Sequence, residues 1–105
     1  MSLKTRELNA SLTSGYTSEG LQKDGKNCIF VAEFDGLTAN IPAHLEESVD
    51  GETYQEVPDS ATTLGAGQTV QMWNDGMLPR GTMLRVVIGS AEAGTIVGIK
   101  LLSNG

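Results

Sequence analysis

Residues 28–47 read CIFVAEFDGLTANIPAHLEE, and this stretch decides the fold class. Every second residue is apolar on both sides of Asp35-Gly36, a dipeptide that strongly favours a two-residue hairpin turn. Such a turn would pair residue 34 with 37, 32 with 39, 30 with 41 and 28 with 43, all of them apolar. Turn chemistry and face pattern therefore agree on an antiparallel hairpin with one buried face.

Four later segments, 53–57, 68–73, 82–88 and 95–102, also have strand composition and lie between turn-forming residues. In the last two, the alternation places Leu84, Val86 and Ile88, and then Val97, Ile99 and Leu101, on the buried side. The loop 89–94 is expected to join these two strands as an antiparallel pair. No segment keeps a helical period, so the sequence predicts an all-β chain, a small antiparallel β-sandwich or jelly roll.

The first 27 residues differ from the rest of the chain. They are polar, and Gly15, Gly20 and Gly25 interrupt them repeatedly. We expect residues 1–27 to form an extended N-terminal arm and residues 28–105 to form the sandwich domain. The four leucines of the arm are too widely separated to make a core of their own, and we expect them to contact other protein: Leu3, Leu8, Leu12 and Leu21.

Charge and length limit the kinds of partner. The 105-residue chain has a formal net charge of −6, and an acidic body repels phosphate backbones, so we expect no nucleic-acid partner. No apolar run approaches the roughly 20 residues that cross a bilayer, and no signal core follows the N-terminal charges, so we expect no membrane partner. The cations of the arm could lie on an acidic neighbour, although a solvated acidic surface is the simpler interpretation.

Few residues could carry chemistry. The single histidine, His44, shares the outward face of its strand with Glu46, but the sequence places no nucleophile nearby, and the single cysteine, Cys28, has inward parity. The acidic run that begins at Glu46 and contains Asp50 lacks calcium-loop spacing, which favours a solvated turn over a metal site. No phosphate-binding glycine loop is present. We therefore expect no catalytic residues, no metal, no cofactor and no enzymatic activity.

Trp73 leaves two alternatives open. Its parity is opposite to that of Val70 and Met72, so it is either packed in the core or exposed as a platform for a sugar ring. The second alternative corresponds to a carbohydrate-binding module.

Residues 48–57, SVDGETYQEV, are followed by a Gly-rich loop, by the Leu84-Arg85-Val86-Val87 strand and by a last strand near 95–102. Over residues 28–102 this arrangement resembles small β-sandwich virion structural proteins of tailed phages, although the 48–57 motif also occurs in carbohydrate-binding and discoidin-like sandwiches. The resemblance implies a capsid decoration (cement) protein or a minor capsid protein, located in the virion. We expect it to bind the major capsid protein or other virion proteins through its arm and its sheet edges and so to stabilise the particle. It carries over no functional residues.

Several positions opposite the expected core sets are also apolar, among them Ile29, Val31, Ile96 and Leu102. Contiguous apolar patches on a small chain indicate that something covers them, so we expect a homo-oligomer or binding to a capsid lattice. Analogy with capsid decorations on threefold axes suggests a trimer. The expected interface residues are Leu3, Leu8, Leu12, Leu21, Ile96 and Leu102.

Overall fold

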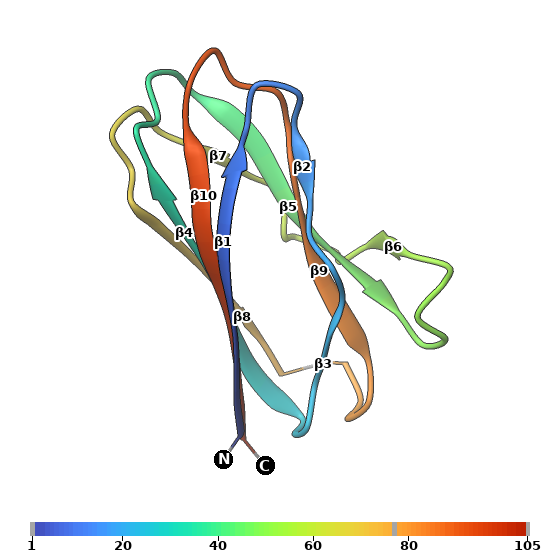
Figure 1. Ribbon diagram of the computed structural model, residues 1–105. Helices are drawn as coiled ribbons and strands as arrows, with labels where there is room; N and C mark the ends of the chain where they lie inside the picture. Colours follow the sequence, from blue (N-terminus) through green and yellow to red (C-terminus); the bar gives the residue numbers. More distant parts are fainter. Residues whose placement is uncertain (1, 77, 105) are drawn as a thin grey trace.

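The computed structural model describes residues 2–76 and 78–104, and Figure 1 shows two antiparallel sheets that face each other. All elements in these residues are strands. The predicted fold class, a small antiparallel β-sandwich, is confirmed. The described residues contain no helix suited by length and hydropathy to span a bilayer.

The first sheet has four strands in the order β1-β10-β4-β8. Their bounds are Ser2–Ser11 for β1, Thr95–Asn104 for β10, Asn27–Asp35 for β4 and Val70–Asp75 for β8. The second sheet runs β2-β9-β5-β6, with β3 also paired to β9 and β7 also paired to β5. Its bounds are Tyr16–Thr17 (β2), Met83–Ile88 (β9), Ile41–Ser48 (β5), Gln55–Glu56 (β6), Leu21–Gln22 (β3) and Thr62–Leu64 (β7).

The core lies between the inner faces of the two sheets. Strand β4 contributes Phe30, Ala32 and Phe34, and β9 contributes the 84, 86 and 88 side chains, as the alternation predicts. The Phe30 and Trp73 rings meet edge to face, with their centroids 6.2 Å apart. Burying one apolar side chain of this size contributes about 1.5–3 kcal/mol.

The predicted hairpin around Asp35-Gly36 is wrong. Strand β4 pairs with β10 and β8, whereas β5 pairs with β9, β6 and β7, so the 36–40 loop crosses from one sheet to the other. The loop 89–94 likewise joins strands of different sheets. The expected parity is nonetheless confirmed, because Ile41 and Leu45 are buried as Phe30 and Phe34 are. Strands on facing sheets also point their apolar sides at each other, so the same pattern fits both arrangements.

The predicted N-terminal arm is also wrong. Strand β1 pairs with β10 as an edge strand of the first sheet, and the chain then crosses to the second sheet, where β2 and β3 pair with β9. Leu12 and Leu21 are 0% and 1% exposed, so both belong to the core of this chain. Two backbone hydrogen bonds hold the crossing in place, from Leu12 to Gly94 and from Ala91 to Leu12. Leu12 and Leu21 need no core of their own because they enter the common one. Leu8 is partly buried against that core, whereas Leu3 stays exposed.

A β-bulge in β10 changes which residues of that strand are buried. The register with β4 shifts between Ile96 and Gly98, and the extra residue, Val97, turns outward. Ile96 is therefore 0% exposed and Val97 is 40% exposed, the reverse of the expectation from simple alternation. Ile99 and Leu101 keep the inward positions that were predicted for them.

The bulge predicts that two neighbouring substitutions lower the free energy of unfolding by very different amounts. Ile96→Ala should lower the free energy of unfolding by about 2–5 kcal/mol because it leaves a cavity in the core. Val97→Ala should change it by less than about 1 kcal/mol because the side chain already meets water. Urea denaturation of the two variants tests this, and a larger loss for Val97→Ala than for Ile96→Ala would contradict the bulge.

Candidate functional site

The outer face of the first sheet is apolar along much of its length. The strand register places its residues in three rows that run across β1, β10, β4 and β8. From one end of the sheet inward, the rows are Leu3, Leu102, Ile29 and Asn74, then Thr5, Lys100, Val31 and Met72, then Glu7, Gly98, Glu33 and Val70.

We call six of these side chains the outer apolar face: Leu3, Ile29, Val31, Val70, Met72 and Leu102. Leu3, Met72 and Val70 are 61%, 56% and 41% exposed, and the other three are half-buried by their neighbours. One ion pair joins two of these rows, between Lys100 Nζ and Glu33 Oε1, 3.2 Å apart. A contiguous apolar patch of this kind on a small chain marks a surface that another molecule covers.

A hollow of about 390 Å³ extends the outer apolar face toward the end of the sheet where the termini lie. Ile29 and Leu102 form its apolar wall. Three amide side chains give it hydrogen-bonding groups, Asn27, Asn74 and Asn104. The hollow can accept an apolar side chain while the amides bind polar atoms around it.

A buried lysine holds the wall of this hollow together. Lys23 is 0% exposed, and its Nζ donates to Asp75 Oδ2 (2.6 Å), to the Lys26 carbonyl (2.6 Å) and to the Leu78 carbonyl (2.7 Å). All three ammonium protons are thus used, as a buried charge requires. The cluster ties the segment after β3 to the end of β8. Burial raises the pKa of the neighbouring Cys28 thiol, which keeps it protonated.

Loss of the lysine should be costly. Lys23→Met leaves the carboxylate of Asp75 beside the core without this cation, and we expect the free energy of unfolding to fall by about 3–5 kcal/mol. Lys26→Met, which changes an exposed lysine three residues away, should cost less than about 0.5 kcal/mol. Urea denaturation compares the two, and equal stabilities would refute a supporting role for Lys23.

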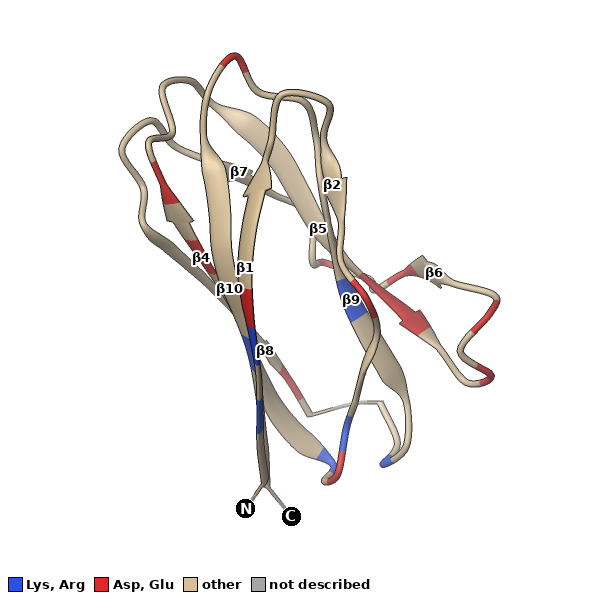
Figure 2. Cartoon of the chain, in the orientation of Figure 1, with Lys and Arg blue, Asp and Glu red and all other residues tan. Residues whose placement is uncertain are grey.

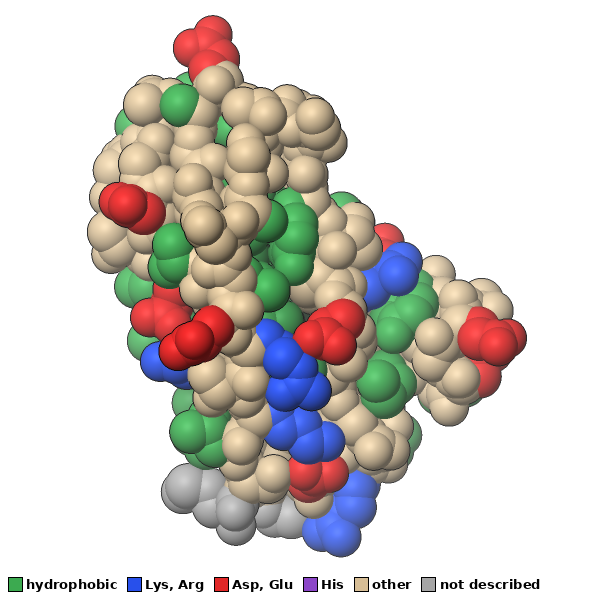
Figure 3. All heavy atoms as spheres, viewed as in Figure 1, with side chains coloured by type: hydrophobic (Ala, Val, Ile, Leu, Met, Phe, Trp, Pro, Cys, Tyr) green, Lys and Arg blue, Asp and Glu red, His purple; other side chains and the backbone are tan. Residues whose placement is uncertain are grey.

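Both edges of the first sheet are covered by side chains of the same chain. Along β1, Lys4 pairs with Asp24 at 3.3 Å and Arg6 pairs with Glu19 at 2.8 Å. On the side of the molecule that Figure 3 shows, blue side chains form a column with red side chains beside it. Three cations of residues 1–27, Lys4, Arg6 and Lys23, therefore pair within the chain. Along β8, the amides of two glutamines, Gln68 and Gln71, donate to the carbonyls of Val70 and Met72. Such covering blunts strand edges.

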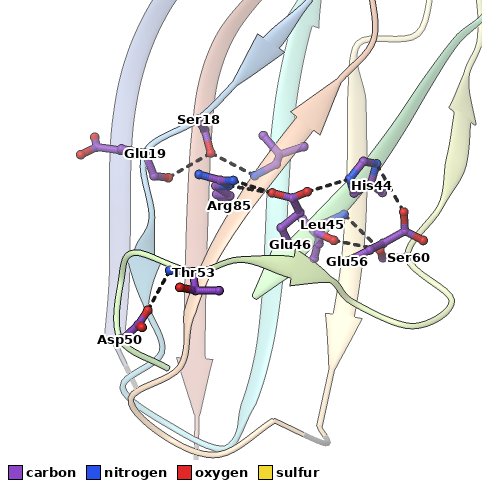
Figure 4. A network of polar contacts seen from close by, with 11 residues as sticks. Ser18, Glu19, His44, Leu45, Glu46, Asp50, Thr53, Glu56, Ser60 and Arg85 are labelled. Carbon is purple, nitrogen blue, oxygen red and sulfur yellow. Dashed lines mark hydrogen bonds and ion pairs between the residues drawn. The ribbon is translucent and has the colours of Figure 1, made fainter. Parts of the chain in front are cut away.

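The acidic residues gather elsewhere, on the hairpin of β5 and β6, which projects from the body in Figure 2. Glu46 Oε1 accepts hydrogen bonds from Arg85 Nε (2.9 Å) and Nη2 (2.7 Å), and its Oε2 lies 3.3 Å from His44 Nε2 (Figure 4). Burial alone would raise the pKa of Glu46, but these hydrogen bonds outweigh it and lower the pKa. Arg85 also stacks on Tyr54, with its Cζ 3.7 Å from the ring centroid.

This network fastens the projecting hairpin to β9. The expected neighbourhood of His44 and Glu46 is confirmed, and a further carboxylate, Glu56, lies 3.8 Å from His44 Nδ1. The described polar contacts of His44 are thus with carboxylates, which orient the ring on the strand. Among residues 2–76 and 78–104, no three His, Cys, Asp or Glu side chains form a group that could hold a metal ion.

Asp50 closes the turn of the hairpin. Its carboxylate accepts from the backbone amides of Thr53 (2.9 Å) and Glu52 (2.8 Å) and from the Ser48 hydroxyl (2.8 Å). These hydrogen bonds lower its pKa from 3.8 to about 2. The Asp50 carboxylate therefore stabilises the turn through hydrogen bonds from residues of the same loop.

The lowered pKa of Asp50 predicts the pH range in which this turn holds. A depressed carboxyl pKa stabilises the folded turn above about pH 4, and that stabilisation is lost as the pH falls through about 2. Carboxyl-carbon NMR should show an Asp50 midpoint near pH 2. In Ser48→Ala, which removes one hydrogen bond, the midpoint should rise. A midpoint at the ordinary value in the unsubstituted protein would contradict the turn geometry.

The structure separates the predicted site residues into two groups. Leu3 and Leu102 lie on the outer apolar face, and Leu8 is partly buried against the core. Leu12, Leu21 and Ile96 are buried in the chain's own core, so the expectation that they form an interface is wrong. Trp73 is 8% exposed and its Nε1 donates to the Ser60 carbonyl (2.8 Å), so the alternative of an exposed sugar platform is also wrong.

Val70 and Met72 belong to this site, although they were not among the interface residues expected from the sequence. The alternation of strand β8 could have identified them, because both have the parity opposite to Trp73. Placing the large indole in the core turns the other two side chains outward.

Comparisons with known proteins give distant similarity to solved structures. No protein-family model and no curated protein sequence matches the chain. Among solved structures, a pentameric capsid protein from metagenomic phage sequences is similar over 91% of this chain, at 18% identity and a TM-score of 0.40. The matched region spans 66% of that protein. A similarity this low assigns no function to the chain.

Proposed function

We propose that this chain is a non-enzymatic structural protein of a phage particle, a capsid decoration protein that acts in the virion by binding other protein surfaces. The observation that carries the proposal is the outer apolar face, where Leu3, Met72 and Val70 are exposed to water. Holding such side chains outside costs solubility unless a protein surface covers them.

The covered strand edges support a face as the binding surface. Pairing of β1 or β8 with a foreign strand would displace the ion pairs of Lys4 and Arg6 or the amides of Gln68 and Gln71. Contact through the outer apolar face displaces only water. The sheet-edge contacts expected from the sequence are therefore replaced by a face contact in this proposal. The phage particle as the location rests on the resemblance carried by residues 48–57 and by the strands that follow.

Purified particles of the phage that encodes the chain test the proposal. We expect the chain in a fixed ratio to the major capsid protein, and particles grown without it should release DNA at a lower temperature. Adding back the purified chain should restore both. A chain that is absent from washed particles, or whose loss leaves the release temperature unchanged, would refute a decoration role.

A further inference from the structure

We propose that the outer apolar face binds a second copy of this chain across a twofold axis, with Lys100 of each copy paired to Glu33 of the other. This inference rests on the proposed structural role only in that both concern binding through protein surfaces. It names the partner of the outer apolar face, which the proposed function leaves open.

Charge favours a second copy at this place. The chain carries a net charge of −6, so two copies repel each other in most orientations. Six acids lie between residues 46 and 59, on or beside the projecting hairpin of the second sheet: Glu46, Glu47, Asp50, Glu52, Glu56 and Asp59. The three rows of the outer face hold only Glu7, Glu33 and Lys100, a net of −1. Two copies that meet there keep their acidic hairpins apart.

The strand order supplies the symmetry. Strands β10 and β4 lie in the middle of the sheet, between β1 and β8. A twofold axis that runs along the strands between them lays β10 of one copy over β4 of the other, so that each row meets itself. Leu102 then faces Ile29 of the second copy. Leu3 faces Asn74 of the second copy, beside the hollow, and this is the reciprocal contact that a twofold interface requires.

The same operation explains the one ion pair on the face. Within a chain, Lys100 reaches one row along the sheet to Glu33 on the neighbouring strand. Across the proposed axis, β4 of the second copy lies over β10, so Glu33 of that copy stands one row along from Lys100 on a sheet about 10 Å away, within reach of the extended lysine side chain. The two intramolecular pairs thus become one cluster of four alternating charges beside Val31, Met72 and Val70. Desolvation by these side chains strengthens the cluster relative to an exposed pair.

The flat area of the face is of the same order as that of a stable interface. Three of its strands are nine or ten residues long and β8 has six residues. With strands about 4.8 Å apart and about 3.3 Å per residue, they cover about 550 Å² before side-chain relief is counted. Stable interfaces bury about 800 Å² per partner, so side-chain relief has to supply the remainder.

Charge exchange across the interface gives the sharpest test. In Lys100→Glu each copy has glutamates at both positions of the pair, and in Glu33→Lys each copy has lysines at both positions. We expect wild type to sediment as a dimer at tens of micromolar, each variant alone to dimerise at least tenfold more weakly, and a one-to-one mixture to recover the dimer. The double variant Lys100→Glu/Glu33→Lys keeps every pair with its direction reversed and should dimerise as wild type does.

A matched pair of apolar variants locates the contact. Met72→Asp should abolish the dimer, whereas Val49→Asp, at a residue 88% exposed in the turn after β5, should not. Tryptophan fluorescence of Trp73 and urea denaturation confirm that both variants fold. A monomeric wild type at 100 µM, a mixture that stays monomeric, or an equal loss in Val49→Asp would overturn the inference. A chain bound to particles yet monomeric overturns the inference alone, and a dimer absent from particles refutes only the decoration role.

Discussion

Strand β4 is apolar on both of its faces, and the rest of the structure depends on how the two faces are used. Its inner set, with Phe30 and Phe34, fills the space between the sheets, while Ile29 and Val31 point outward. A two-layer sandwich normally gives each strand one face to water. Strand β4 lies between β10 and β8, which also carry apolar outer residues. The apolar side chains that point outward from these three strands therefore lie together on a single surface.

The alternation in the sequence correctly predicted which sides of β4, β5 and β9 are buried, but not which strand lies beside each of them. Period-two patterning reports only the direction of a side chain. Phe34 and Ile41 point into the same core from opposite sheets, and their sequence pattern is that of a hairpin pair. Distinguishing the two requires the path of the 36–40 loop. Five residues suffice to cross between sheets, and a two-residue turn signal within them does not exclude the crossing.

Two other features depend on tertiary structure and therefore could not be predicted from the sequence. The bulge in β10 exchanges the positions of Ile96 and Val97, and nothing in the run TIVGIKLL marks where alternation breaks except the glycine at 98. From the sequence, strand β1 resembles a loose arm because its register partners, all on β10, lie more than 80 residues away. Of the surface site, Leu3, Ile29, Val31 and Leu102 could be found from parity alone, whereas Met72 and Val70 required the placement of Trp73.

The excess negative charge and the outer apolar face lie on different parts of the molecule. The hairpin of β5 and β6 carries most of the excess acid and is fastened to the body by Arg85, which meets Glu46 on one side and Tyr54 on the other. This leaves the first sheet nearly neutral. If both sheets carried a large negative charge, two copies would repel each other in every orientation. If the chain had no excess charge, it would associate through any apolar patch. Because most of the excess acid lies on the hairpin of β5 and β6, the nearly neutral first sheet can act as the assembly surface that is proposed above.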